Sequence, residues 1–507
     1  RQGVGDSQQP KDDSNANASI ALSWKRPFHT EEIIRERNLS VSDSPEMFVL
    51  HTSFPPDDRS VGYERGTAVS KAWEEATTAA AIEVTGYVTS HLNELAGIGE
   101  DAPDREVKLI AFCHTFAERA FRRPLSDEQK LLYVDRQFAE ANDPDLAVRN
   151  VLLLVLKSPR FLYREVGGAS ATNPYDIAAR MSFGLWDSIP DEALRQAAAN
   201  GRPTDRVQIA EQLGRMLRDP RTNSKLREFL LTWLKVSEPP NVSKDPNVFP
   251  EFTAETESDL RTSLEQSNDD VLNSKSDDIQ QLVSCDSIFL NGRLASIYDV
   301  DLPKDAPFEK VRCQPEHRSG LVSHPYLLAC FAYTNSTSPI HRGVFISRNL
   351  LGRSLKQPPE AVAPLPVELH AELTTRERVT LQTQPEACQT CHSMINPLGF
   401  SLEEFDAIGR FREVERDRPV NALGSYTTKS GQVVEFDGVP DLAAFLAASE
   451  ESQAAFVRQL FQYLVKQPIR AYGPDRWKQL QKTFAEDDFN IHKLAAQIAA
   501  IGALPLE

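Results

Sequence analysis

The chain has 507 residues, of which 40% are hydrophobic, and its formal net charge at pH 7 is −17. A chain of this size buries a large core and divides into several domains or subdomains. The negative charge excludes nucleic acid and anionic membrane surfaces as partners, because no basic stripe is present to neutralise phosphates. The longest apolar run, residues 151–156, is far shorter than the roughly 18 residues of a membrane-spanning helix.

Residues 1–19 are polar and predict a disordered stretch. The chain begins without an initiator Met and without a signal peptide. We therefore interpret it as a processed or isolated form of an exported protein.

Helical patterns dominate the remaining sequence. An Ala- and Glu-rich stretch predicts one long helix over 71–95, and the turn at 122–126 precedes another helix with acidic residues in its first turn. Amphipathic or buried patterns predict further helices over 110–121, 146–156, 177–186, 206–217, 226–234 and 451–465. The predicted fold class is mainly α, a helical protein of several subdomains.

Strand signals are few and local. The stretch Leu423 to Val439, with Ser430 and Gly431 at its centre, predicts a small β-hairpin. Residues 20–24 and 47–53 predict a minor pair of strands near the N-terminus. The Pro-rich stretch 355–366 excludes a regular helix, and we expect it to run extended toward the segment around residue 388.

That segment carries the sequence Cys388-Gln389-Thr390-Cys391-His392, which has the C-x-x-C-H spacing of covalent haem attachment. Two thiols add to the vinyl groups on one edge of the haem, and the imidazole of the next residue then lies under the iron. With 6 Cys and 10 His in the chain, a chance match has a probability on the order of one in a thousand. The motif predicts one covalent haem c per chain, with His392 as its proximal iron ligand.

Two other chemistries use closely spaced cysteines. A structural zinc site requires a second Cys or His pair at suitable spacing, and the sequence has none. A thioredoxin-type redox pair follows a strand and opens a helix, and the loop residues with Pro385 before Cys388 do not suit it.

The residues after the motif mix turn formers with apolar side chains. Leu398 and Phe400 are candidates for the wall of a porphyrin pocket. Arg410 and Arg412 are candidate partners of the haem propionates. The alternative for each arginine is a surface salt bridge.

Residues 388–412 resemble the cytochrome-c-like block of a family of exported, planctomycete-type proteins, built from adjoining DUF1587-, DUF1595-, DUF1592-, DUF1588- and DUF1585-like blocks of unknown function. The other blocks of the family match in chain order, and together they extend from residue 54 to residue 507. The resemblance implies the architecture and the haem-binding segment, and it implies no settled activity. The segments that carry it are 54–57, 119–126 with 158–165, 180–186 with 190–192, 318–321 with 337–339 and 342–343, and 457–473.

The chain departs from the family pattern near the motif. Gln382 stands where a His is expected six residues before the first haem Cys, and Asn396 stands where the family favours Asp. His341 replaces a residue that is usually Lys or similar, and the extra N-terminal cytochrome module of many relatives is absent from this sequence. Such departures from the family pattern, close to the motif, are compatible with a different chemistry at the haem.

The second axial ligand of the iron decides the reaction, because Met or His gives an electron carrier and an open position gives a catalyst. Met394 is too near His392 to reach the opposite haem face, and the methionines at 47, 181 and 216 are not favoured. His324 is the first candidate for the distal side and a possible iron ligand, and His341 is the second. The alternative for each is an ordinary core or surface histidine. Arg342 is a candidate to stabilise negative charge on bound oxygen.

Three functions are compatible with these features. The first is a haem-dependent oxidoreductase of peroxidase or oxidase type, because the chain is far longer than a one-haem carrier requires. The second is an electron-transfer cytochrome that docks a redox partner. The third is a surface module for carbohydrate or protein with a structural haem. A small molecule or polysaccharide is the alternative partner, and the sequence does not define the substrate or the oligomeric state.

Haem attachment takes place outside the cytoplasm, so we expect a periplasmic or extracellular protein. Four further cysteines, Cys113, Cys285, Cys313 and Cys330, allow three disulfide pairings or remain buried free thiols. The sequence predicts seven segments. They are a polar tail (1–25), an N-terminal block (26–100), two helical blocks (101–170 and 171–300), a distal-side block with its Pro-rich connector (301–375), the haem segment (376–420), and a hairpin with C-terminal helices (421–507).

Overall fold

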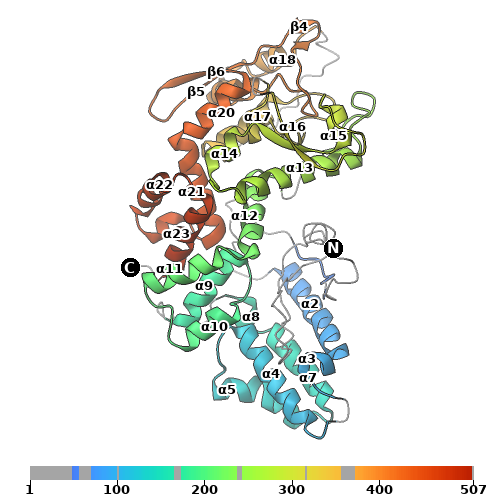
Figure 1. Cartoon of the computed structure of the whole chain (residues 1–507), viewed down its shortest axis with the longest axis vertical. Coiled ribbons are helices and arrows are strands. Elements are labelled where there is room, and N and C mark those ends of the chain that lie inside the picture. Colours follow the sequence, from blue (N-terminus) through green and yellow to red (C-terminus); the bar gives the residue numbers. More distant parts are fainter. Residues whose placement is uncertain are drawn as a thin grey trace. The chain divides into compact units, whose positions relative to one another are not determined.

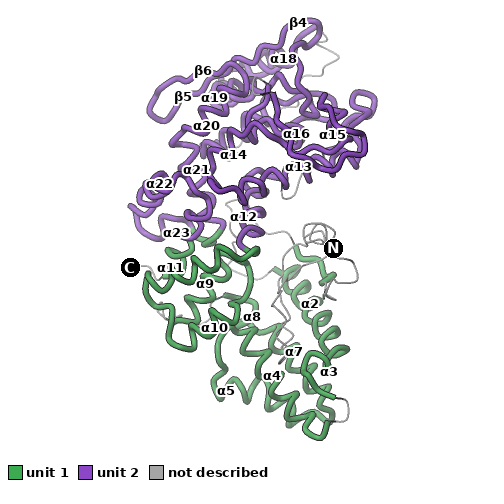
Figure 2. The backbone as a smooth tube through the Cα atoms, viewed as in Figure 1, with its two compact units in different colours: residues 1–221, 464–467, 498–507 green, residues 222–463, 468–497 purple. Residues whose placement is uncertain are grey.

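The computed structural model describes residues 48, 50–55, 70–99, 102–164, 173–236, 242–314, 317–355 and 372–504. The chain forms two compact units (Figure 2). Unit 1 comprises Arg1–Arg221, Leu464–Gln467 and Ile498–Glu507, and unit 2 comprises Thr222–Tyr463 and Pro468–Gln497. Both are mainly helical (Figure 1), which confirms the predicted fold class. Among the described residues, no helix is both long and apolar enough to cross a membrane.

The first part of unit 1 is a helical layer in which polar caps define the helix starts. The side chain of Ser70 accepts a hydrogen bond from the N–H of Trp73, and Ser126 forms a capping box with Gln129. The elements of this unit are α2 (Lys71–Ser90), α3 (Leu92–Ala96), α4 (Arg105–Phe121), α5 (Asp127–Lys130), the π-helix η2 (Leu131–Asp135), α6 (Arg136–Glu140), α7 (Pro144–Leu156), α8 (Pro159–Leu162), α9 (Pro174–Trp186), α10 (Glu192–Ala199) and α11 (Arg206–Met216).

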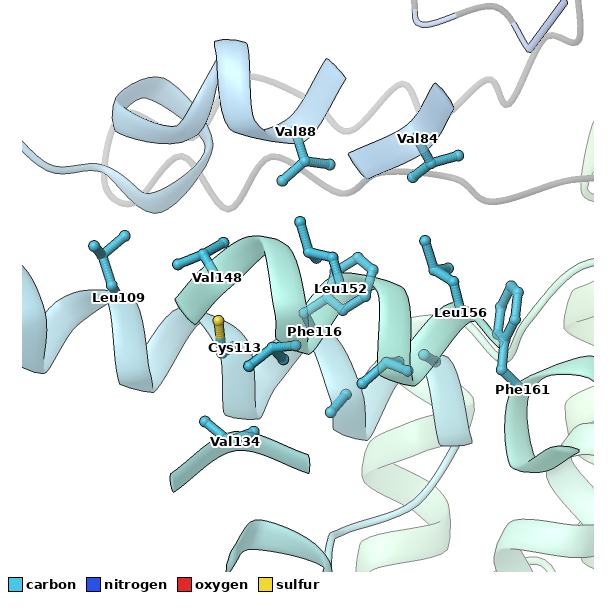
Figure 3. Close-up of a cluster of buried hydrophobic side chains, with 14 of the residues drawn as sticks. Val84, Val88, Leu109, Cys113, Phe116, Val134, Val148, Leu152, Leu156 and Phe161 are labelled. Atoms are coloured by element: carbon cyan, nitrogen blue, oxygen red, sulfur yellow. The ribbon is translucent and has the colours of Figure 1, made fainter. Parts of the chain in front are cut away.

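Apolar side chains at helical spacing on α2, α4 and α7 form the core of this layer (Figure 3). Val84 and Val88 come from α2, and Val148 and Leu152 come from α7. Cys113 lies inside this cluster, fully buried, and burial raises the pKa of its thiol to about 12. It therefore behaves as a small apolar core residue.

Unit 2 combines helices with three two-stranded antiparallel sheets. The hairpin of β5 with β6 confirms the predicted hairpin, whereas the pairings of β1 with β2 and of β3 with β4 were not predicted. The described residues of the predicted N-terminal strand 47–53 have no strand conformation, and 20–24 and 356–366 lie outside the described residues. The strands of the unit are β1 (Ser287–Leu290), β2 (Glu309–Arg312), β3 (Val414–Glu415), β4 (Arg418–Pro419), β5 (Leu423–Thr427) and β6 (Val433–Asp437).

In unit 2, the buried rings of Phe229, Trp233 and Phe456 pack against one another. The predicted stripe on 451–465 is confirmed, because Phe456, Leu460 and Phe461 are all fully buried. The helices that belong to this unit or begin or end in it are α12 (Pro220–Trp233), α13 (Ala254–Leu272), α14 (Ile279–Ser284), α15 (Gly292–Ile297), η3 (Leu321–Ser323), α16 (Pro325–Cys330), α17 (Pro339–Phe345), η4 (Ile346–Leu350), α18 (Thr375–Gln382), α19 (Glu386–Phe400), α20 (Gly438–Ala448), α21 (Glu450–Val465), η6 (Ile469–Tyr472), α22 (Arg476–Glu486) and α23 (Ile491–Ala503).

Two glycines allow α17 and α19 to cross at backbone distance. A Cβ atom at Gly343 would collide with the carbonyl oxygen of Ile395, and one at Gly399 would collide with that of Pro339. The two contacts also fix the relative direction of the helices as antiparallel, because the later residue of α17 meets the earlier residue of α19. The element that follows α17, η4, therefore runs toward the N-terminal turns of α19 and contacts this helix.

Candidate functional site

The C-x-x-C-H motif lies in the first turns of α19, which begins at Glu386 directly after Pro385. Residues i, i+3 and i+4 lie on one face of an α-helix, so Cys388, Cys391 and His392 project to the same side. All three are half-buried, whereas the intervening Gln389 and Thr390 are exposed. Both thiols are free. The helix thus presents two thiols and an imidazole together along one edge.

A chain of hydrogen bonds orients the imidazole of His392. Its Nδ1 lies 2.9 Å from Oδ1 of Asn396, one turn later on α19. The amide nitrogen of Asn396 donates to the hydroxyl of Thr383 at 2.8 Å, and that hydroxyl donates to the carbonyl of Val379 at 2.8 Å. Because the Thr383 hydroxyl uses its proton on Val379, it accepts from the amide nitrogen, and the amide oxygen faces His392.

This arrangement selects one tautomer of the imidazole. Nδ1 of His392 carries the proton, since its neighbour Asn396 Oδ1 only accepts, and Nε2 keeps its lone pair. Among the described residues, Nε2 has no hydrogen-bond partner. Metal-bound histidines usually have the second ring nitrogen held by such an acceptor. His392 is therefore prepared to act as a ligand through Nε2.

His324 is an N-terminal cap of α16. Its Nδ1 accepts a hydrogen bond from the N–H of Tyr326 at 3.2 Å, so its Nε2 carries the proton toward the hydroxyl of Ser263, 3.2 Å away. The residue is 5% exposed. Burial, together with the nearby positive charge of Arg318, lowers the pKa of His324 to about 3. Both ring nitrogens are thus engaged in structural contacts by a neutral imidazole.

This burial predicts a pH dependence of stability. Between a folded pKa of about 3 and an ordinary value of 6.5, the unfolded chain binds more protons at His324 than the folded chain does, so stability falls as the pH falls. From pH 7 to pH 5 the residue accounts for a loss of about 2 kcal/mol in the free energy of unfolding. The variant His324→Asn, which keeps a capping acceptor, should lose about 2 kcal/mol less over this interval in urea denaturation. Equal losses in both proteins would contradict the assignment.

Arg342 clamps the turn that follows α19. Its Nη1 donates to the carbonyls of Leu402 at 2.8 Å and Phe405 at 2.9 Å, and its Nη2 donates to that of Asp406 at 2.7 Å. The carboxylate of Glu403 lies 3.6 Å from Nη1. Arg342 is 1% exposed. Its guanidinium is therefore used for structure, with both terminal nitrogens engaged.

His341 is exposed on α17, and its ring lies 5.1 Å from the ring of Tyr333, measured between centroids. The antiparallel crossing places Pro339 beside Gly399 and Gly343 beside Ile395. His341 therefore lies level with the C-terminal half of α19, whereas the Cys388–His392 segment lies toward η4.

The other predicted site residues divide into core residues and ion pairs. Leu398 and Phe400 are buried in the C-terminal half of α19, and the guanidinium of Arg376 lies 4.3 Å from the ring centre of Phe400. Arg410 is paired with Asp406 and Glu251, and Arg412 with Glu403 and Glu415. Both arginines line a large cavity that includes neither thiol of the motif nor His392. The structure thus brings Cys388, Cys391 and His392 together, and it places the other candidates elsewhere.

Two residues of the site were not predicted from sequence. Asn396 had a signal, since it follows His392 by four residues and therefore lies over it on a helix. Thr383 had none, because its contact with Asn396 depends on how α18 packs against α19.

Known protein families match three adjoining parts of the chain. Three family models match in chain order: Protein of unknown function (DUF1595) over residues 109–165, Protein of unknown function (DUF1592) over 172–300, and Protein of unknown function (DUF1588) over 318–415. No curated protein and no solved structure matches the chain.

The fold and these adjoining blocks define a mainly α-helical, multi-domain protein. The chain belongs to the planctomycete-type family of unknown function that such blocks characterise, which confirms the family resemblance seen in the sequence, whereas the haem-binding segment stays a prediction. The DUF1588 match includes both the crossing helix α17 and the motif on α19. The resemblances of 54–57 and 457–473 to the terminal blocks stay predictions.

The residues on α19 fit a haem c. The donor set comprises two unbonded thiols at i and i+3 and an imidazole at i+4 whose Nε2 lone pair is available. Among the described residues, no group of three or more His, Cys, Asp or Glu side chains has the geometry to hold a metal ion. A tetrapyrrole needs only one such protein nitrogen on its proximal side, and α19 provides it.

Proposed function

We propose that this protein is a monohaem c-type redox protein that carries its haem on α19. The observation that carries the proposal is the shared face of Cys388, Cys391 and His392, together with the hydrogen bond that holds His392 Nδ1 on Asn396. When bound, the haem supplies an iron that takes up and releases one electron.

The chain's own residues have separate roles in this proposal. The thiols of Cys388 and Cys391 would hold the haem, each through a C–S bond formed by addition of the S–H across one vinyl group. His392 would hold the iron through Nε2, with its Nδ1–H kept on the amide oxygen of Asn396. Thr383 holds that amide in place.

Electron transfer is the reaction that the described contacts favour. Peroxide chemistry needs a distal imidazole to move a proton and a cation to stabilise the oxygen. His324 and Arg342, the first candidates for these roles, have their ring and terminal nitrogens engaged with Ser263, Tyr326 and backbone carbonyls. We therefore propose a redox protein as the partner, and a periplasmic or extracellular location, where haem c attachment takes place.

The reaction class is tested with purified, haem-loaded protein. We expect a reversible change between oxidised and reduced spectra under electrochemical titration, and only slow spectral change in stopped-flow mixing with hydrogen peroxide. Rapid peroxide turnover with a reducing substrate would contradict the electron-transfer proposal and favour a peroxidase with other distal residues.

Asn396 provides a prediction specific to this chain. The carboxylate of the variant Asn396→Asp accepts the Nδ1 proton more strongly than an amide does, which makes the imidazole of His392 more basic and favours the oxidised iron. The reduction potential of this variant should be lower than that of the wild type. The variant Asn396→Leu should shift the potential upward, because no acceptor remains.

The change Asn200→Asp, at an exposed asparagine of unit 1, serves as the control. It adds the same charge and should leave the potential unchanged. Equal potentials in the wild type and in both the Asn396→Asp and Asn396→Leu variants would show that Asn396 does not act through His392.

A further inference from the structure

A cavity of about 990 Å³ opens in unit 2. Its walls are formed by the β1–β2 pair, the residues after α15, the start of α18 and the loop that follows α19. Organic ligands of ordinary size occupy sites of roughly 300–1,000 Å³, so the volume suits one such molecule. Cys388, Cys391 and His392 are not among the lining residues, so the cavity is a different site from the motif on α19.

The lining is basic in a strongly acidic protein. Six arginines face the cavity and only three carboxylates do, whereas the whole chain has a net charge of −17. The arginines are Arg312, Arg318, Arg378, Arg410, Arg412 and Arg416, and the carboxylates are Asp299, Asp406 and Glu415. Local positive charge of this kind attracts anions into a cleft.

Three of these arginines lack a carboxylate partner within 4.0 Å among the described residues. Arg318 donates to the carbonyls of Ser323 and Gly409, and Arg378 donates to the carbonyl of Leu373 and the hydroxyl of Thr375. Arg378 is 6% exposed, and burial lowers the pKa of both Arg318 and Arg378. Arg416 is exposed in the turn between β3 and β4. Buried cations without a counter-charge are costly, and a bound anion would offset that cost.

The wall also includes apolar and aromatic side chains beside polar ones such as Gln314 and Asn335. Phe249, Val300 and Pro325 line the cavity. Phe411 lines it too, and its ring is stacked on that of His317, with centroids 3.8 Å apart and planes 12° apart. Flat apolar surface beside guanidinium groups is the combination that holds a ligand with a charged end and an apolar body.

We propose that this cavity binds an organic anion, whose oxyanion group meets the guanidinium groups of Arg378 and Arg416 and whose apolar body lies against Phe411 and Val300. A carboxylate and a phosphate ester share this chemistry, because both accept hydrogen bonds from a guanidinium fork. The proposal does not depend on haem binding. The segment α18–Thr383 nevertheless serves both sites, since Arg378 lines the cavity and Thr383 holds Asn396.

The test is isothermal titration of the full chain with four probes: 2-naphthoate, the uncharged 2-naphthamide, 2-naphthyl phosphate and inorganic phosphate. We expect at least one of the two naphthyl anions to bind, at least 10-fold more tightly than the amide and than inorganic phosphate. The tighter of the two anions identifies the oxyanion class. Equal affinity for the amide, binding of inorganic phosphate as tight as that of the ester, or no binding of either anion would overturn the proposal.

Two variants locate the site without disturbing buried structural contacts. Arg416→Gln, at an exposed position, should weaken binding of the naphthyl anion about 10-fold, the size of one lost charge-assisted contact. Val300→Trp, at a half-exposed position of the wall, should abolish binding by placing an indole where the apolar body of the ligand lies. The control Arg470→Gln removes the same charge from an exposed residue of unit 2 outside the cavity and should bind as the wild type does. Wild-type affinity in both Arg416→Gln and Val300→Trp would overturn the assignment to this cavity.

Discussion

A chain in which Cys388 and Cys391 are both replaced by Ala is expected to retain its helical structure and to lose all covalently bound haem. The two thiols are half-buried and make no disulfide, so their removal takes little packing from unit 2. It removes both atoms that form C–S bonds with the vinyl groups. After export in a host that matures c-type cytochromes, a haem stain of a denaturing gel should be negative for this variant and positive for the wild type.

The matched control changes the two residues between the thiols. Gln389 and Thr390 are exposed on the same turn, and Gln389→Ala with Thr390→Ala keeps the spacing of Cys388, Cys391 and His392. This protein should stain like the wild type. Covalent haem in the double Cys variant would show that another part of the chain carries it.

The second large effect concerns the crossing of α17 with α19. The variants Gly343→Ala and Gly399→Ala each place a methyl group against a backbone carbonyl oxygen, of Ile395 and of Pro339 respectively. A backbone atom does not move aside as a flexible side chain does, so the helices must separate. Overpacking of this kind costs about 1–3 kcal/mol or more in the free energy of unfolding. Urea denaturation followed by circular dichroism measures the loss.

Gly214 on α11 is the control for helix propensity. A Cβ atom there has no heavy atom within 4 Å to meet, so Gly214→Ala should stabilise the protein by up to about 1 kcal/mol. Destabilisation by Gly214→Ala as large as that by Gly343→Ala would indicate that the effect at α17 is not a matter of close approach. In haem-loaded Gly343→Ala, the bond between His392 and the haem iron should also be weaker, because α19 would shift together with η4.

Most of the helices were predictable because their pattern is local. The apolar stripe of α21 and the acidic start of α5 come from residues a few positions apart, and the structure has both. The break at His91 between α2 and α3 was missed, because the helix-favouring composition continues through it. The sheet β1–β2 was missed, since its pairing joins short segments about 20 residues apart that show little alternation.

The candidate site was predictable only where its residues stand at a characteristic spacing in the sequence. The motif on α19 and the reach from His392 to Asn396 follow from helical periodicity alone. The structural roles of His324 and Arg342 were not apparent, because they depend on contacts with distant residues such as Ser263 and Leu402. His324 did have a local signal, since it precedes Pro325 at the first position of a helix, where a capping side chain is common.

The basic cavity had no signal in the sequence. Its arginines are spread from Arg312 to Arg416 within an acidic chain, and tertiary folding alone gathers them. Arg410 and Arg412 illustrate the difficulty, because their pairing with Glu251 and Glu403 has no signal in the sequence, and their pairing with haem propionates stays a prediction.

Covalent attachment of haem to α19 is measured by the mass of the intact chain under denaturing conditions, followed by the mass of the proteolytic peptide that contains residues 388–392. We expect the wild-type chain to be heavier than its sequence by one haem, with the whole increment on this peptide. A chain that has the mass of its sequence alone, although a c-type cytochrome matured in the same cells carries its haem, would contradict this expectation.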